Sequence, residues 1–426
     1  MLDIKFIRDN KEAVKKAATD KNISLDVERL LSLDKTRREL ISKIESARAS
    51  QKKLGRENIE EATKLKEEQK KLDLELRTIE ADYESLMLKV PTIPSSDTPI
   101  GKNADDNVEI LKWGKIPEFD FEPKDHLQLG RELDILDLER GAKVAGYRGY
   151  YLKNEGARLV LALMLYAFNK MVLKGYTPMI PPTLVKEFVL FGSGYFDGKE
   201  YDAEKDEIYQ IATRDKDMDG RASEEKKFLV GTAEPSLLAY YSGEILKEED
   251  LPIRLCGFSP CYRSEIGSYG KDTKGMYRVH EFMKVEQVIL VAADLDQADK
   301  LQQEMVAASR QLHEELGLPY RLLQICTGDM SAGKYKAFDI EAWATGLKRW
   351  CETGSASNFL DWQARRLNVR YVDKKGQTRF VYMLNNTALA TPRTFIALIE
   401  NNQQKDGSIE VPKVLREYCG FKKIKR

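Results

Sequence analysis

The 426-residue sequence is poor in cysteine and histidine and carries no net charge. Its five cysteines are scattered over a long chain, and its three histidines lie far apart. This usage is typical of reduced thiols and argues against a disulfide framework. Only Cys256 and Cys261 lie close together, and no second pair of ligands accompanies them. The spacing therefore does not favour a zinc site.

Long hydrophobic runs and a leader pattern are also missing. No stretch of eighteen apolar residues occurs, since even the segment 159–173 is interrupted by Asn169 and Lys170. Residues 1–5 lack the basic start and apolar core of a signal peptide. We therefore expect no membrane association and a cytoplasmic location. The 69 Lys and Arg residues balance 69 Asp and Glu residues, so net charge alone indicates no nucleic-acid partner.

What the first hundred residues do contain is the repeat of a coiled coil. Residues recur every seven positions in two runs: Leu33, Leu40, Ala47 and Leu54, then Leu65, Leu72, Ile79 and Leu86 beside Gln69, Leu76, Tyr83 and Val90. Such spacing places each run on one stripe of a helix. The segment 55–58 indicates a tight reversal, and Pro91 ends the second helix. We predict an antiparallel helical hairpin, with a long arm over about residues 26–90 that projects roughly 45 Å.

The predicted tip of this hairpin is basic. Arg48, Lys52, Lys53 and Arg56 cluster there with no acidic residue among them, which suits contact with the phosphates of a nucleic acid. A dimerisation or spacer role is the alternative, and the seven-residue repeat alone does not separate the two.

The rest of the chain predicts a linker at 101–125 and an α+β domain at 126–426. Helical patterns alternate with β-rich ones, the former at 156–174, 235–247 and 293–316 and the latter at 285–292 and 379–384. The polar segment 214–227 is predicted to be a surface loop or hairpin.

Charged residues in the predicted strands are incompatible with a hydrophobic core. Arg263 and Glu265 lie two residues apart, and Arg278, Phe282 and Glu286 follow at intervals of four, so each set is expected to share one strand face. Buried charges at this density cost several kcal/mol each unless they are paired or bound to a ligand. We therefore expect this face to bind a ligand.

Two further segments carry ligand-binding chemistry. Segments 339–343 and 352–358 mix carboxylates with hydroxyl residues, which are oxygen ligands suited to Mg²⁺. After segment 384–391, Pro392 fits the first turn of an apolar helix. Arg393 would then stand beside the positive end of that helix, where it is well placed for an anion.

Together these segments resemble the three signature motifs of class II aminoacyl-tRNA synthetases, and the closest match is to seryl-tRNA synthetases of bacterial type. The resemblance covers nearly the whole chain. It is specific because four short motifs occur in order: Thr232-Ala233-Glu234, Arg263-Ser264-Glu265, Arg278-Val279-His280 and Ser357-Asn358. It implies a class II antiparallel sheet flanked by helices, with an N-terminal tRNA-binding domain at 1–100 and a catalytic domain at 126–426.

The resemblance also implies a reaction and its partners. Serine would be activated with ATP to seryl-adenylate and then transferred to the 3′ end of tRNA(Ser), with Mg²⁺ as cofactor. The enzyme would be a homodimer with the segment 175–182 and its preceding helix at the interface. Whether tRNA(Sec) is a second substrate stays open at this point.

Site residues follow from the resemblance position by position. It implies Arg263, Glu352 and Arg393 as catalytic residues and Thr232, Glu234, Arg263, Glu286, Asn385 and Thr387 around serine. It implies ATP contacts from Arg263, Glu265, Arg278, Val279, Phe282, Glu352, Ser355 and Arg393, with Mg²⁺ on Glu352 and Ser355, and tRNA contacts from Arg48, Lys52, Lys53 and Arg56. Phe282 would stack under adenine, with Arg393 over the other face. No side chain is needed as a nucleophile, so His126, His280 and His313 need no catalytic role.

Two alternatives remain at the level of sequence. One is a related ligase that loads a carrier protein, but such relatives lack the hairpin. The other is an inactive paralogue, which would show damage at the key positions Arg263, Glu286, Glu352 or Arg393. All four are intact.

Overall fold

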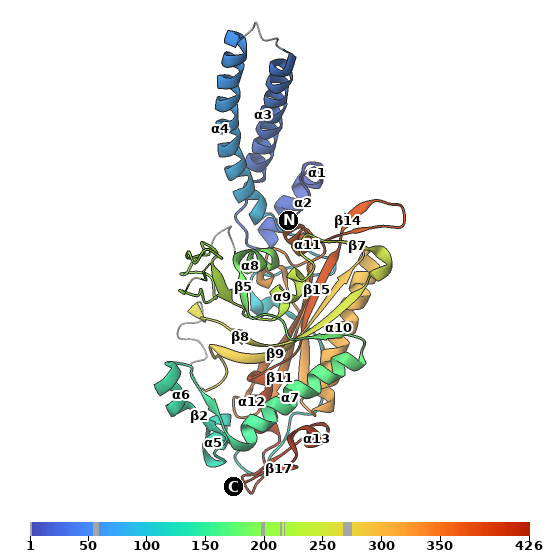
Figure 1. The fold of residues 1–426 in the computed structure, drawn as a ribbon. Helices are drawn as coiled ribbons and strands as arrows, with labels where there is room; N and C mark the ends of the chain where they lie inside the picture. The colour runs from blue at the N-terminus through green and yellow to red at the C-terminus, as the bar shows by residue number, and fades with distance from the viewer. Residues whose placement is uncertain (1, 54–58, 197–200, 214, 217, 267–274) are drawn as a thin grey trace.

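The computed structural model describes residues 2–53, 59–196, 201–213, 215–216, 218–266 and 275–426. A helical arm projects from a larger body that is built on one sheet (Figure 1). The chain begins at the base of the arm and ends on the opposite side of the body (Figure 1).

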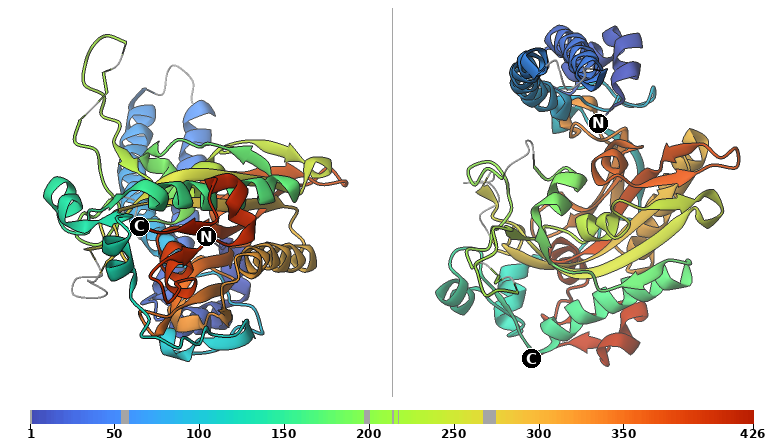
Figure 2. Two further views of the ribbon diagram at one scale, coloured as in Figure 1. Left: turned by 90° about the horizontal axis from the view of Figure 1, so that it is seen from below. Right: turned by 45° about the horizontal axis from the view of Figure 1, so that its top comes forward.

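The arm consists of two long helices, α3 (Val27–Lys53) and α4 (Ile59–Lys89), which lie side by side (Figures 1 and 2). At 1.5 Å per residue they are about 40 and 46 Å long. Residues of the predicted stripe such as Leu72 and Ile79 are partly buried, whereas Leu74 between them is 68% exposed. The coiled-coil hairpin is therefore confirmed. Leu54 and the predicted reversal at 55–58 lie outside the described residues.

Contacts across the arm are both apolar and ionic. Arg29 pairs with Asp82 at 2.9 Å, and Arg37 pairs with Glu80 at 3.1 Å. Exposed pairs of this kind contribute about 0–1 kcal/mol each, so the apolar stripe provides most of the stability. At the base, α1 (Ile4–Asp9) and α2 (Lys11–Asp20) close a small core with the arm helices.

The body is built on an eight-stranded sheet. In spatial order its strands are β1 (Val108–Trp113), β10 (Tyr320–Gln324), β11 (Lys336–Ala344), β12 (Arg349–Asn358), β15 (Tyr382–Ala390), β9 (Glu281–Val291), β8 (Ile253–Tyr262) and β4 (Thr177–Met179). Neighbouring strands are antiparallel except for β4 and β8. The predicted antiparallel sheet of an α+β protein is confirmed.

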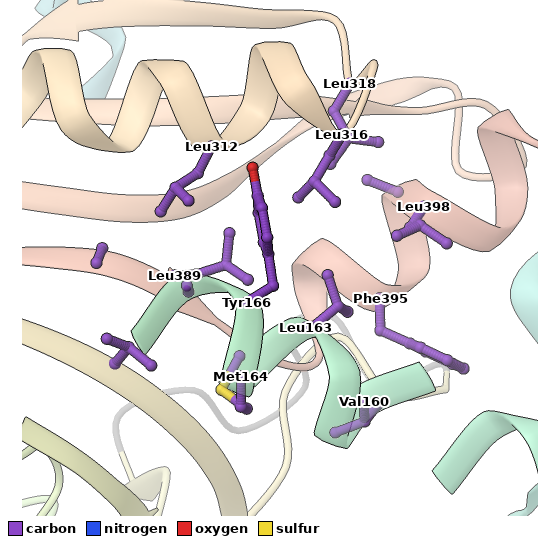
Figure 3. Close-up of a cluster of buried hydrophobic side chains, with 14 of the residues drawn as sticks. Val160, Leu163, Met164, Tyr166, Leu312, Leu316, Leu318, Leu389, Phe395 and Leu398 are labelled. Atoms are coloured by element: carbon purple, nitrogen blue, oxygen red, sulfur yellow. The ribbon is translucent and has the colours of Figure 1, made fainter. Parts of the chain in front are cut away.

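Three helices cover one face of this sheet: α7 (Asn154–Leu173), α10 (Leu295–Glu315) and α12 (Arg393–Asn401). Tyr166 of α7 stands in the core between them with its hydroxyl directed toward α10 (Figure 3). There it donates to Glu315 Oε2 at 2.5 Å, so the buried hydroxyl is satisfied. Helices α7 and α10 match the helices predicted at 156–174 and 293–316.

Helix α7 is long and apolar enough to cross a membrane by length and composition alone. Half of its most apolar window is buried, however, and its inner side chains pack on the sheet. These contacts identify it as a core helix with one side left exposed.

Two predicted elements differ from the structure. The helix predicted at 235–247 is divided into α9 (Glu234–Ala239) and β7 (Ile245–Lys247), because Gly243, with a φ of 80°, turns the chain between them. The strand predicted at 379–384 is likewise shared between β14 (Thr378–Phe380) and β15.

The predicted linker is partly built into the sheet. Strand β1 lies within 101–125 and pairs with β10 as an edge strand, with a bulge between Glu109 and Leu111. That part of the segment is therefore not a free connection. The predicted domain limits themselves stay a prediction.

The remaining elements are short and surround the sheet. The helices are α5 (His126–Glu132), α6 (Leu138–Ala145), α8 (Glu187–Ser193), α11 (Trp362–Leu367) and α13 (Arg416–Cys419), and the strands are β2 (Leu136–Asp137), β3 (Tyr151–Leu152), β5 (Leu184–Lys186), β6 (Lys227–Leu229), β13 (Arg370–Val372), β16 (Ile409–Glu410) and β17 (Lys423–Ile424). Within the polar segment 214–227, Lys216 bridges Ala222 and Met218 is fully exposed, as expected for a surface hairpin.

Candidate active site

A cleft lies on the sheet face opposite α7, α10 and α12. It consists of two cavities of about 790 and 180 Å³. Arg263, Lys284, Glu352 and Thr387 line both. On β9, residues 282, 284 and 286 face the cleft, whereas residues 285 and 289 pack into the core behind the sheet. Side chains alternate between the two faces of a strand, and this alternation puts Lys284 and Glu286 on the cleft side.

The larger cavity ends in a buried polar pocket. Thr232 Oγ1 and Thr387 Oγ1 donate to Glu286 Oε2 at 3.3 and 3.4 Å. Asn385 Nδ2 donates to Glu234 Oε1 at 2.9 Å. All five side chains are buried, so the structure brings together the residues predicted to surround serine. Thr232 Oγ1 also accepts from Glu234 N at 3.4 Å.

Lys284 belongs to the same pocket and was missed from the sequence. Its Nζ lies 2.6 Å from Glu286 Oε2 and donates to Thr387 Oγ1 at 3.4 Å, and its side chain is 6% exposed. The ammonium neutralises one of the two buried carboxylates. A signal was available, because Lys284 lies between Phe282 and Glu286 on the strand face that was predicted to bind a ligand.

Glu234, the first residue of α9, carries the other carboxylate. Its Oε1 also accepts from Gln363 Nε2 at 2.7 Å. Burial and, after it, the negative charge of Glu286 raise the pKa of Glu234 to about 7. A carboxylate held in this way has a strong preference for a cationic partner.

Arg263 stands where the two cavities meet. Its Nε donates to Gly231 O at 3.3 Å, and its Cζ lies 5.4 Å from the centre of the Phe282 ring. His280 fixes the backbone, since its Nδ1 donates to Arg263 O at 2.9 Å and its carbonyl accepts from Arg263 N. The guanidinium is thereby held in place at the junction.

The predicted strand positions of these charges were wrong. β8 ends at Tyr262, and Glu265 has a φ of 56°, so Arg263 and Glu265 are not alternate residues of a strand. Arg278 likewise precedes β9, which leaves Phe282 and Glu286 as the pair on one strand face. Glu265 contacts cationic partners outside the sheet.

Those partners are two arginines on Glu265 Oε2. Arg278 Nη1 donates at 3.0 Å, and Arg148 Nη1 lies at 3.3 Å. Arg148 comes from the segment after α6, and no pattern in the sequence marked it. Two guanidinium groups on one carboxylate leave positive charge beside the smaller cavity, which suits a polyphosphate.

The smaller cavity is also lined by Val279, Phe282 and Tyr277. The Tyr277 ring contacts two guanidinium groups, with Arg349 Cζ at 4.2 Å and Arg393 Cζ at 4.6 Å from its centre. The Arg393 guanidinium thus lies against Tyr277 in this structure. The arrangement of adenine between Phe282 and Arg393 stays a prediction. Arg393 is the first residue of α12, and Pro392 precedes the helix instead of lying in its first turn.

An oxygen-rich group lies on β11 and β12. Glu352 Oε2 accepts from Arg393 Nη1 at 3.0 Å. Desolvation alone would raise the pKa of Glu352, but the charges of Arg393 and Arg263 outweigh it and hold that pKa below its ordinary value. Ser355 pairs across the ladder with Asp339, whose buried Oδ1 accepts no hydrogen bond within the described part of the chain.

This donor set fits Mg²⁺. The carboxylates of Glu352 and Asp339 and the hydroxyl of Ser355 are hard oxygen ligands of the type that Mg²⁺ prefers, and one oxygen of Asp339 is unsatisfied. No group of three or more His, Cys, Asp or Glu suited to a metal occurs among the described residues. Mg²⁺ is commonly held by one or two protein carboxylates, and a nucleotide's phosphates complete the coordination. Asp339 was quoted in the sequence motif but received no role there.

The histidines away from the cleft have structural contacts. His126 N and Nδ1 both donate to Glu400 Oε1 at 2.8 Å, while Met276 N donates to His126 Nε2 at 3.3 Å. His313 is buried between Ser309 O and Thr353 Oγ1. These contacts support the predicted structural use.

The predicted tRNA contacts on the arm are only partly described. Arg48 Nη2 lies 3.5 Å from Asp73 Oδ1, so this arginine has an acidic neighbour that the sequence did not reveal. Lys52 is exposed. The side chain of Lys53 and all of Arg56 lie outside the described residues.

Two protein-family models match the chain. The seryl-tRNA synthetase N-terminal domain matches residues 1–94, and the tRNA synthetase class II core domain (G, H, P, S and T) matches residues 216–402. Curated relatives named serine–tRNA ligase match over nearly the full length. The protein of Borrelia garinii subsp. bavariensis is 40% identical over 99% of this chain and 98% of its own. That of Treponema denticola is 38% identical over 100% of both.

Solved structures are similar as well. The seryl-tRNA synthetase of Pyrococcus horikoshii complexed with ATP superimposes with a TM-score of 0.87 at 35% identity, covering 100% of this chain and 99% of its own. The cytoplasmic serine–tRNA ligase of Naegleria fowleri in complex with AMP gives 0.87 at 30% identity with the same coverage. The prolyl-tRNA synthetase of Giardia lamblia, at 16% identity and 0.57 over 68% of this chain and 54% of its own, shares the fold alone.

Proposed function

The chain belongs to the seryl-tRNA synthetase family, and we propose that the cleft on its sheet is the site of serine activation. The protein is a serine–tRNA ligase, which activates serine with ATP to seryl-adenylate and transfers the seryl group to the 3′ end of tRNA(Ser). The arrangement of the cleft assigns a task to each of its residues.

The observation that carries the proposal is the polar pocket around Glu234 and Glu286. Among the described residues, the side chains that donate to the Glu234 carboxylate are the neutral amides of Gln363 and Asn385. It would therefore bind the serine ammonium. Glu286 and Thr387 would bind the serine hydroxyl. Alanine has no hydroxyl and would forfeit these hydrogen bonds inside a buried polar site, which costs more than the loss of a contact in water.

Arg263 would then hold the reacting groups together. Serine in the larger cavity and the nucleotide in the smaller one meet at its guanidinium, which can bind both the serine carboxylate and the α-phosphate. Negative charge that develops at the phosphorus is stabilised by a cation that is already in place. Arg278 and Arg393 would bind the remaining phosphates, and Phe282 with Val279 would contact the adenine side.

Glu352 and Ser355, with Asp339 beside them, would hold Mg²⁺. The ion would neutralise phosphate charge and orient the phosphates for in-line attack. Arg393 keeps Glu352 ionised, so the carboxylate is in the form that a divalent cation needs.

The test is serine-dependent exchange of diphosphate into ATP, followed by charging of tRNA. We expect serine alone among the amino acids to support both reactions. Exchange without charged tRNA would favour the carrier-protein ligase, and the absence of any exchange would favour an inactive paralogue. Neither alternative is supported by the intact cleft or by the full-length match that includes the N-terminal domain.

The arm is proposed to bind tRNA(Ser) through its basic tip, and the protein is proposed to act in the cytoplasm. Whether tRNA(Sec) is also charged is settled by offering both transcripts to the purified enzyme. The long projecting hairpin supports the role, because the arm has no large core of its own and reaches about 40 Å from the body.

A homodimer is proposed through the exposed side of α7. Leu161, Leu165 and Leu173 there are 50, 47 and 82% exposed, and Ile180 after β4 is 82% exposed. Several large apolar side chains exposed on one helix and the segment after it are typical of a protein–protein interface, and an interface between two copies of one chain is usually isologous. Leu165→Lys should produce a monomer in sedimentation experiments, whereas Leu74→Lys on the arm should not. A wild-type protein that stays monomeric at high concentration would contradict the proposal.

A further inference from the structure

The larger cavity is far bigger than serine requires. Its volume of about 790 Å³ lies toward the upper end of the range for drug-sized ligands. The pocket around Glu234 occupies only its inner end. The outer part is bounded by Ser24 and Lys89 of the N-terminal region and by the loop Ser331–Lys334. A second ligand can therefore enter here beside serine.

Two lysines line this outer part without a counter-ion. Lys334 is half-buried and Lys89 is exposed. Neither ammonium group has a hydrogen bond or ion pair with any residue that the structure describes. Burial raises the pKa of Glu234, and the positive charge of Lys334 acts against that rise, as it also does at Asp339. Lys334 is thus close enough to the reaction site to act on its charges.

The N-terminal region holds the loop that carries Lys334. Lys21, which is 4% exposed, donates from Nζ to the carbonyl oxygens of Ala332 at 3.1 Å and Lys334 at 2.5 Å. Thr92 N donates to Ala332 O at 2.9 Å. Gly333 packs so closely on Trp362 that a Cβ there would lie 2.7 Å from the indole ring. The loop is therefore clamped between the two parts of the chain.

We propose that Lys334 and Lys89 bind phosphates of the single-stranded 3′ end of the tRNA as it approaches the seryl-adenylate, and that Lys21 positions Lys334 for this contact. The inference rests on the proposed function. With the nucleotide in the smaller cavity, the larger one is the open route to Arg263. Sites for single-stranded nucleic acid combine cations with aromatic surfaces, and Tyr195 and Phe359 line the same cavity.

The experiment compares the two half-reactions in Lys334→Met and Lys89→Met. Serine-dependent diphosphate exchange reports activation without tRNA. Single-turnover transfer from preformed, enzyme-bound seryl-adenylate to subsaturating tRNA reports entry of the 3′ end. We expect the single-turnover rate of transfer to fall about tenfold in each variant. The rate of diphosphate exchange should change much less. The logarithm of the transfer rate falls linearly with the logarithm of the salt concentration. The steepness of this line, called the salt slope, should decrease by about 0.7 for each phosphate contact removed.

Two further variants separate positioning from binding. Lys21→Met should slow transfer and lower the salt slope by no more than Lys334→Met does, because Lys21 acts through Lys334 and does not touch RNA. Its melting temperature is measured alongside, so that unfolding is recognised. Lys413→Met, on the exposed surface near the C-terminus, is the matched control and should change neither reaction.

Two results would overturn the inference. The first is transfer and salt slope that stay at the wild-type level in both lysine variants. The second is equal loss of exchange and transfer, which would assign Lys334 to activation. Failure of the proposed function looks different, because the wild-type protein itself would then show no serine-dependent exchange.

Discussion

Replacing Glu234 by glutamine keeps the shape of the side chain and removes its charge. Gln363 Nε2 and Asn385 Nδ2 can still donate to the remaining oxygen, at the 2.7 and 2.9 Å seen here. What is lost is the carboxylate proposed to meet the serine ammonium. A hydrogen bond to a charged group contributes about 1.5–3 kcal/mol, which predicts a roughly 10- to 150-fold rise in the serine KM.

The same substitution should stabilise the unliganded protein at alkaline pH. The pKa of Glu234 is raised from 4.5 to about 7 by burial and by Glu286. Between these values the folded protein holds a proton that the unfolded chain has lost, so the free energy of unfolding falls as pH rises through this window. The full rise corresponds to about 3 kcal/mol, a cost that the Glu234→Gln variant does not carry.

The kinetics of diphosphate exchange across about pH 5 to 9 test the role of the Glu234 charge in serine binding. Thermal melting across the same range tests its effect on stability. Wild-type kcat/KM for serine should rise with pH through about 7, because the carboxylate has to be ionised to bind serine, and the variant should lose this dependence. The variant should melt above the wild type at pH 8. The exposed Glu417→Gln is the control. A wild-type serine KM in the variant, or a lower melting temperature than wild type at alkaline pH, would refute the argument.

Three other perturbations have defined outcomes. Glu352→Gln should raise the Mg²⁺ concentration needed for half-maximal exchange, because one anionic ligand is lost; an unchanged Mg²⁺ titration would remove Glu352 from the metal site. Neutralising Arg48 and Lys52 together should raise the tRNA KM and spare exchange, and equal loss of both activities would contradict the role of the tip. Glu400→Gln should cost about 3 kcal/mol, because its amide N–H would face either the donors of His126 or Gly346 N, and should lower Tm by roughly 3–5 °C. Melting at the wild-type temperature would show that this buried pair is not needed.

The sequence by itself determined the elements whose signals are local. A seven-residue repeat specifies an arm, because the stripe has to be covered along its whole length. Phe282 and the charged Glu286 predicted a ligand-binding strand face, because alternation in a strand is a property of the backbone. Resemblance to a known family then connected Glu234, Glu286 and Thr387, which are far apart in sequence and adjacent in the structure.

Only the tertiary structure decided which groups act on one another. Arg148 shares Glu265 with Arg278, and Lys21 holds the loop of Lys334. Neither pairing has a period or a fixed spacing, since each depends on how distant segments pack. The same reason explains why the helix predicted at 235–247 was too long: the segment after Gly243 pairs with β13, and that long-range ladder overrides the local preference.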